Sequence, residues 1–210
     1  MRIGFGVLLV LLPISLWAET PLHERIDDLL AEAASAKQVD LQPAADDAEF
    51  LRRAYLDLIG RIPTADEAKA FLADGAADKR TQLVDRLLTH PAHPVRMAEL
   101  FHVMLMERRG NHDDWDAFLR HAFAENEPWD AIARAIINPD ADDESHKGAA
   151  YFMTSRLVKE GAMAEVDVPG LTRDVGRLFA GVDLQCAQCH DHIDIDDYKQ
   201  RDFQGLHMIF

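Results

Sequence analysis

The sequence predicts an all-α protein, a multi-helix orthogonal bundle that ends in a short turn and a closing helix. Apolar residues recur at helical spacing along nearly every stretch, and capping signals precede some of these stretches. No stretch alternates apolar and polar residues long enough to predict a sheet. With 210 residues, 48% of them hydrophobic, the chain is large enough to bury a substantial core.

The predicted helices follow one another closely through the first two thirds of the chain. Residues 51–58 present one apolar helix face, and the segment 64–74 opens with Thr64 and Glu67 in the spacing of a capping box. Four further segments carry apolar stripes at the same spacing: 78–88, 95–109, 115–123 and 128–137. We interpret these stripes as core-facing, including Leu100 and Met104 in the second of the four.

The segment 138–148, NPDADDESHKG, interrupts the helical spacing and predicts an exposed acidic loop. It has a faint similarity to a calcium loop, but Ser145 stands where the sharp turn of such a loop requires glycine. A solvated loop is therefore preferred. Helical spacing resumes over 171–179, and the chain then leads directly to its only two cysteines.

The N-terminus has the layout of a secretory signal peptide over residues 1–18. Arg2 precedes an apolar run, and polar sequence begins at Glu19. We expect cleavage after Ala18 and export to the periplasm or cell surface, with an uncleaved anchor as the alternative. No later segment is long and apolar enough to predict a membrane span, so one helical domain is expected over residues 22–210.

The charge and the motifs exclude several classes of function. A formal net charge of −15 argues against nucleic-acid backbones and anionic membranes as partners. No nucleophile–base pair, phosphate-binding loop or G-x-S-x-G motif occurs in the sequence.

Residues 186–192, CAQCHDH, hold both cysteines and two of the ten histidines. C-x-x-C-H is the attachment sequence for c-type haem, because two thiols at this spacing can add to both vinyl groups of one porphyrin while the next histidine binds its iron. Thiols used in this way are also protected from the oxidising compartment that an exported protein enters. We predict Cys186 and Cys189 as attachment residues and His190 as the proximal iron ligand.

Two other uses of the cysteine pair stay open. A structural zinc site needs four ligands, and the adjacent Cys189 and His190 fit poorly on one ion. His192 would have to replace His190, and the fourth ligand would have to come from His207 or a carboxylate. A redox-active disulfide usually lies in a βαβ context, which a helical chain does not offer.

A low-spin cytochrome needs a second strong-field ligand on the iron, usually methionine sulfur or histidine nitrogen. His207 and Met208 lie 17 and 18 residues after His190, which is enough chain to reach the opposite face of the porphyrin. We favour His207, since imidazole binds both oxidation states of iron. Purely structural roles for both residues, or a ligand such as Met153 from before the motif, are the alternatives.

Several blocks in order resemble one known family: FLRRAYLDLIGRIPTADEAKAFLAD, DKRTQLVDRLLTHPAH, ENEPWDAIARAII, RLFAGVDLQCAQCHDH and YKQRDFQGLHMIF. Over residues 22–210 the chain resembles the planctomycete-type cytochrome-c-like domain of unknown function, whose members are exported bacterial proteins. The resemblance implies a c-type cytochrome with Cys186, Cys189 and His190 as haem ligands, but no established reaction. After His192 the sequence IDIDD departs from the family pattern, so the resemblance does not imply the path of this loop.

Family members typically continue into a second large domain, and this chain ends at Phe210 in an apolar segment. We expect either a truncated chain or a lone domain. The expected function is electron transfer to a redox partner protein by an exported domain with one haem c. The main alternative is a helical interaction or scaffold module of a cell-surface or polymer-degrading assembly, and a third is an enzyme with an open iron site.

Overall fold

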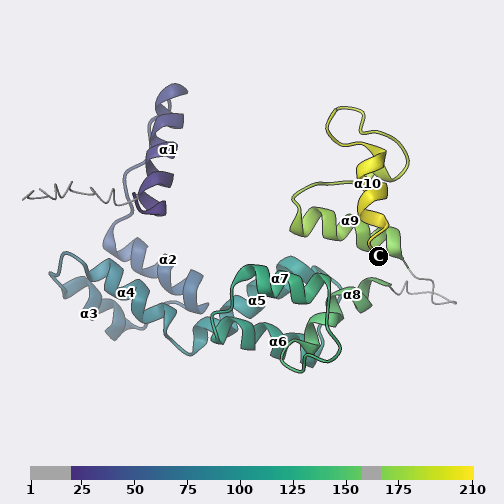
Figure 1. Cartoon of the computed structure of the whole chain (residues 1–210). Helices are drawn as coiled ribbons and strands as arrows, with labels where there is room; N and C mark the ends of the chain where they lie inside the picture. Colours follow the sequence, from purple (N-terminus) through teal and green to yellow (C-terminus); the bar gives the residue numbers. More distant parts are fainter. Residues whose placement is uncertain (1–19, 158–166) are drawn as a thin grey trace, which may run out of the picture. The chain divides into compact units, whose positions relative to one another are not determined.

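The computed structural model describes residues 20–157 and 167–210 (Figure 1). Within these ranges every regular element is a helix and no strand occurs, which confirms the all-α prediction. No helix in the described part of the chain is long and apolar enough to cross a membrane. The expected signal peptide, residues 1–18, lies outside the described residues.

The chain divides into two compact units, residues 1–45 and 46–210. The first unit contains α1 (Leu22–Ala36), which buries no residue and exposes apolar side chains along one face, including Leu22, Ile26 and Leu29. The division between the two units falls inside the single domain expected over residues 22–210, which stays a prediction.

The larger unit begins with three helices, α2 (Asp47–Ile59), α3 (Ala65–Ala73) and α4 (Lys79–Leu88). The predicted capping box is present, because Thr64 Oγ1 accepts from the Glu67 amide at 3.3 Å and Glu67 Oε2 accepts from the Thr64 amide at 2.7 Å. The three helices bury one apolar cluster: Leu51, Ala54, Tyr55, Ile59, Phe71, Leu83 and Leu87.

Four more helices and one 3-10 turn follow: α5 (Ala92–Met106), α6 (Asp113–Ala124), α7 (Trp129–Ile137), η1 (Lys147–Ala149) and α8 (Ala150–Leu157). The main core of the protein lies among them and reaches α9: Ala98, Leu105, Met106, Trp115, Phe118, Leu119, Ala122, Ile132, Ile136, Ala149, Phe152, Leu171 and Val175. The predicted stripe over 115–123 therefore faces the core as expected.

The prediction for α5 was wrong in part. Leu100 and Met104, expected in the core, are 37% and 52% exposed, whereas Leu105 and Met106 are buried. The last turns of this helix are apolar on nearly every side, so spacing alone did not decide which face packs inward.

The acidic segment 138–148 forms turns, as expected of a loop. Its path is fixed by His146, which contacts Asp143 within the loop and Glu127 at the start of the turn before α7.

The chain ends with α9 (Val168–Phe179), a 3-10 turn η2 (Cys186–Gln188) and α10 (Gln200–His207). Figure 1 shows α10 running across α9, in keeping with the expected turn and closing helix. One face of α9 enters the main core, while α9 and η2 both contact α10. A small separate cluster of buried residues joins η2 to α10: Leu184, Ala187 and Phe203. This last group of elements carries the cysteine motif.

Candidate functional site around Cys186 and Cys189

The cysteine motif forms a single tight turn. The amides of Cys189 and His190 both donate to the carbonyl oxygen of Cys186, at 3.2 and 3.3 Å. Ala187, between the cysteines, is fully buried in the cluster with Leu184 and Phe203. Both cysteines are exposed and carry free thiols. The buried alanine thus anchors the turn from beneath and leaves the two thiols accessible on its outer side.

Two side-chain contacts hold this turn between the helices on either side. Arg173 of α9 donates to the side-chain oxygen of Gln188. From α10, the amide side chain of Gln200 donates to the Cys189 carbonyl at 3.0 Å. The turn is therefore attached to both helices through residues that leave the thiols unobstructed.

The side chain of His190 is exposed, and its Nδ1 lies 2.7 Å from the carbonyl oxygen of Asp191. A carbonyl oxygen can only accept, so Nδ1 carries the hydrogen and Nε2 carries the lone pair. Asp191 is held in turn by the Gln200 amide at 2.9 Å. This hydrogen bond, together with the charge of Lys199, lowers the pKa of Asp191 below its usual value. The motif histidine is thereby presented with Nε2 available as a ligand atom.

His192 has a different role. Its Nδ1 accepts from the amides of Asp194 and Ile195, at 3.1 and 3.0 Å, and its own amide donates to the Tyr198 carbonyl at 2.8 Å. The imidazole therefore organises the acidic loop after the motif. The described residues contain no group of three or more His, Cys, Asp or Glu placed to hold a metal ion.

The two candidates for the second iron ligand differ in their surroundings. His207 lies in the last turn of α10, half-buried, with its ring stacked on Phe203 and its Nδ1 3.1 Å from Thr172 Oγ1. Met208 is 80% exposed. The alternative Met153 packs against the main core from α8. Of the three, His207 is the one whose side chain makes a polar contact with α9, the helix that also contacts the motif turn.

Comparison with known families agrees with the sequence blocks. A model described as "PSCyt2: Protein of unknown function (DUF1549)" matches residues 25–210. The chain belongs to the PSCyt2 family. This confirms the resemblance at the level of a family of unknown function, while the cytochrome character implied by that resemblance stays a proposal. Searches of the curated proteins and of the solved structures found no match.

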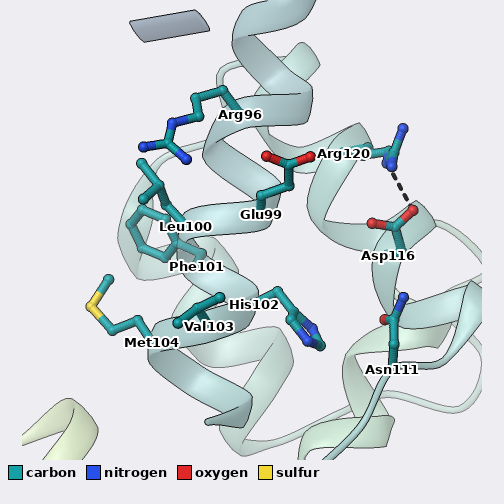
Figure 2. A pocket seen from close by; sticks show the side chains of 10 residues that line it. All are labelled: Arg96, Glu99, Leu100, Phe101, His102, Val103, Met104, Asn111, Asp116 and Arg120. Atoms are coloured by element: carbon teal, nitrogen blue, oxygen red, sulfur yellow. Dashed lines mark ion pairs between the residues drawn. The ribbon is translucent and has the colours of Figure 1, made fainter. Parts of the chain in front are cut away.

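This PSCyt2 chain also has a groove along α5, which the spacing of apolar residues in the sequence did not predict (Figure 2). The groove has a volume of about 830 Å³ and is lined partly by the exposed apolar side chains of Leu100, Val103 and Met104. His102 also lines it, and its Nδ1 accepts a hydrogen bond from the Trp115 indole at 3.2 Å. That contact joins residues 13 positions apart on two helices, so no local sequence signal could have indicated it.

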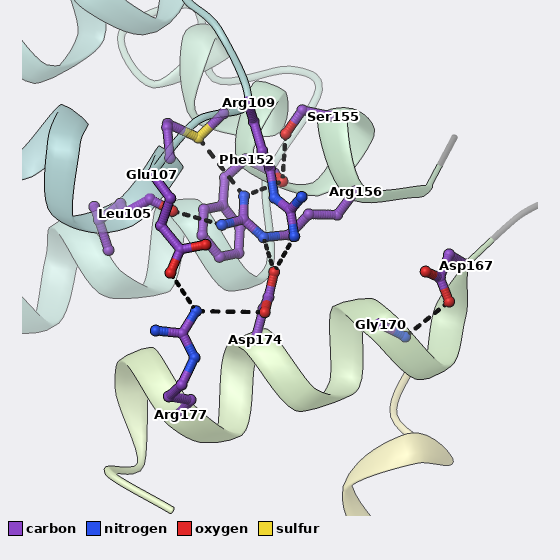
Figure 3. A network of polar contacts seen from close by, with 11 residues as sticks. Leu105, Glu107, Arg109, Phe152, Ser155, Arg156, Asp167, Gly170, Asp174 and Arg177 are labelled. Atoms are coloured by element: carbon purple, nitrogen blue, oxygen red, sulfur yellow. Dashed lines mark hydrogen bonds and ion pairs between the residues drawn. The ribbon is translucent and has the colours of Figure 1, made fainter. Parts of the chain in front are cut away.

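A second feature that the spacing of apolar residues did not predict is an ion network between α8 and α9 whose centre is buried (Figure 3). Arg156 and Asp174 form its centre, and Arg109, Arg177 and Glu107 surround them. The network fixes α9 to the main core, and α9 in turn contacts the motif turn through Arg173. The network therefore helps to hold α9, and with it the motif turn, in position.

Proposed function

We propose that this protein binds one haem c covalently through Cys186 and Cys189, with His190 as the proximal iron ligand, and transfers electrons outside the cytoplasm. One observation carries the proposal: a single ordered turn presents two free, exposed thiols and an imidazole whose Nε2 is available. Axial histidines of cytochromes bind iron through a ring nitrogen while the other nitrogen is hydrogen-bonded to an acceptor.

The residues present fit such a group. Neither thiol is paired, neither is shielded by the fold, and the anchoring of the turn through Ala187 and Gln188 does not involve them. The Asp191 carbonyl keeps the His190 ring in the tautomer that ligation through Nε2 requires. Haem bound here would supply reversible one-electron chemistry at its iron.

Exposure of the attachment residues favours electron exchange with a partner protein, because such a partner can approach the site directly. The net charge of −15 favours a basic partner through long-range attraction.

Export is part of the same proposal, and N-terminal sequencing of the native protein tests it. The proposal expects a mature chain that starts near Glu19, and a soluble cytoplasmic form that retains Met1 contradicts it.

The test of haem attachment is a haem stain on a denaturing gel, using protein produced together with a cytochrome maturation system. Wild-type protein should keep the stain after denaturation. Cys186→Ala and Cys189→Ala should each leave at most one thioether, and the double variant should lose the stain. His192→Ala is the matched control, because it removes a neighbouring imidazole that serves the loop rather than the motif, and it should stain like wild type.

The rival functions give different results in the same experiment. A scaffold module with a structural motif predicts folded wild-type protein without haem, which contradicts the proposal. An enzyme with an open iron site predicts covalent haem with high-spin ferric iron. Electron transfer predicts covalent haem, low-spin iron and a reversible redox titration.

A further inference from the structure

We propose that His207 is the second axial ligand through its Nε2, and that Thr172 is the positioning residue that fixes this imidazole for ligation. The inference rests on the proposed haem attachment, and it assigns the ligand set of that site together with the residue behind it. It arises from the hydrogen bonds around Thr172, a residue to which the sequence assigned no role.

The hydroxyl of Thr172 determines the tautomer of His207. Thr172 is fully buried, and its Oγ1 lies 2.9 Å from the Val168 carbonyl oxygen and 3.1 Å from His207 Nδ1. The carbonyl can only accept, so the single hydroxyl hydrogen is directed toward Val168. Oγ1 therefore accepts from Nδ1–H of His207, and the lone pair of the imidazole is on Nε2.

His207 and His190 are thus held in the same way. In each ring an oxygen atom accepts a hydrogen bond from Nδ1–H. The acceptor is the backbone carbonyl of Asp191 for His190 and the hydroxyl of Thr172 for His207. Within the part of the chain that the structure describes, Nε2 of neither ring has a polar partner. A half-buried imidazole such as that of His207, with Nδ1 fixed by a hydrogen bond and Nε2 without a protein partner, is the arrangement that metal-ligating histidines show.

Neighbouring residues of α9 hold both parts of the proposed site. Thr172 contacts His207, and Arg173, the next residue, contacts Gln188 of the motif turn. The ring of His207 is further restrained by stacking on Phe203, at 5.5 Å between centroids, and Phe203 shares a buried cluster with Ala187 of the motif. The same short stretch of helix and the same small core therefore orient the motif turn and the second histidine.

The other candidates lack this support. Met208 is 80% exposed, Met153 packs against the main core, and Nδ1 of His192 accepts two backbone amides in the following loop.

The experiment compares ferric haem-loaded proteins by absorption and electron paramagnetic resonance spectroscopy. Wild type and Met208→Ala should be low-spin, whereas His207→Ala should become high-spin and return to low-spin when imidazole is added. Thr172→Val keeps the shape of the side chain but removes the hydroxyl, and it should raise the high-spin fraction, while Thr172→Ser should restore the wild-type spectrum. A residue that serves only packing would not show this rescue.

The possible results separate the two proposals. Wild-type protein without covalent haem overturns both. Covalent haem with an unchanged low-spin spectrum in His207→Ala overturns the ligand assignment and leaves haem attachment standing. High-spin His207→Ala with a wild-type spectrum in Thr172→Val retains His207 as the ligand and contradicts the positioning role of Thr172.

Discussion

Asp174 of α9 accepts a hydrogen bond from Nε of Arg156 at 2.9 Å, although the Arg156 side chain is only 1% exposed. The same guanidinium donates to the carbonyls of Leu105 and Phe152 and lies 3.7 Å from the centre of the Phe152 ring. Burial lowers the pKa of Arg156 to about 10, with the charge of Asp174 opposing that shift. Burial would raise the pKa of Asp174, but Arg109 and Arg156 outweigh it and keep that pKa below its usual value.

The first prediction is that Asp174→Asn destabilises the protein by about 3 kcal/mol, because it leaves a buried guanidinium without its counter-charge. Arg177→Ala is the control, since Arg177 contacts the same carboxylate at 3.5 Å from an exposed position and should cost less than about 1 kcal/mol. Urea unfolding of both variants measures the difference. Equal, small losses would mean that the network contributes no more than a surface ion pair.

Much of the fold could be predicted because helical spacing is a local property. Trp115, Phe118 and Leu119 recur at that spacing, and all three are buried. The partnership of Arg156 with Asp174 could not be predicted, because it joins two helices whose relative placement the spacing does not specify.

The candidate site, like the fold, could be predicted from the sequence only in part. Cys186, Cys189 and His190 are contiguous, so the motif was visible in the sequence. The role of Thr172 depends on its contact with His207, which lies 35 residues later in the chain and on a different helix, so no local sequence pattern could have predicted it.

The second prediction concerns the capping box at the start of α3. Thr64→Ala removes the acceptor for the Glu67 amide and should lower the free energy of unfolding by about 1 kcal/mol. Thr154→Ala is a matched control, because its exposed hydroxyl only donates to the Tyr151 carbonyl of its own helix at 3.4 Å and its loss should change stability by less than about 0.5 kcal/mol. Chemical denaturation compares the two, and equal effects would rule out a capping contribution.

The third prediction is a pH dependence that comes from His146. Its Nδ1 lies 2.6 Å from Asp143 and its Nε2 2.9 Å from Glu127, so both ring nitrogens donate and the imidazole is charged. The hydrogen bonds to Asp143 and then Glu127 raise its pKa above 6.5. Hydrogen bonds from Ser145 and then His146 lower the pKa of Asp143 to about 2.

The signs of the two shifts define the pH window. A raised histidine pKa stabilises the fold fully below pH 6.5, and this contribution is lost as the pH rises through the raised value. A lowered aspartate pKa stabilises the fold above pH 3.8, and this contribution is lost as the pH falls toward 2. The difference in Tm between wild type and His146→Gln should therefore shrink on going from pH 6 to pH 9. The exposed His121→Gln control should show no such trend, and a constant difference for His146→Gln would contradict the charged bridge.

The fourth prediction concerns Gly148, the buried centre of η1. A Cβ at this position would lie 1.9 Å from the carbonyl oxygen and 2.5 Å from the carbonyl carbon of Asp114, and 3.0 Å from Cβ of Phe118. The closest atoms belong to the backbone of α6, which cannot turn aside as a flexible side chain can. Gly148→Ala must therefore push η1 away from α6, and we expect a loss of about 3 kcal/mol.

Gly75→Ala provides the comparison, because a Cβ there meets nothing within 4 Å and the residue has no positive φ. This second substitution should be neutral or slightly stabilising, since alanine restricts the unfolded chain more than glycine does. Thermal and urea unfolding of the two variants tests the prediction. Equal stability of the Gly148→Ala and Gly75→Ala variants would contradict the close packing of η1 on α6. It would also contradict the anchoring, through that packing, of the acidic loop that ends at Gly148.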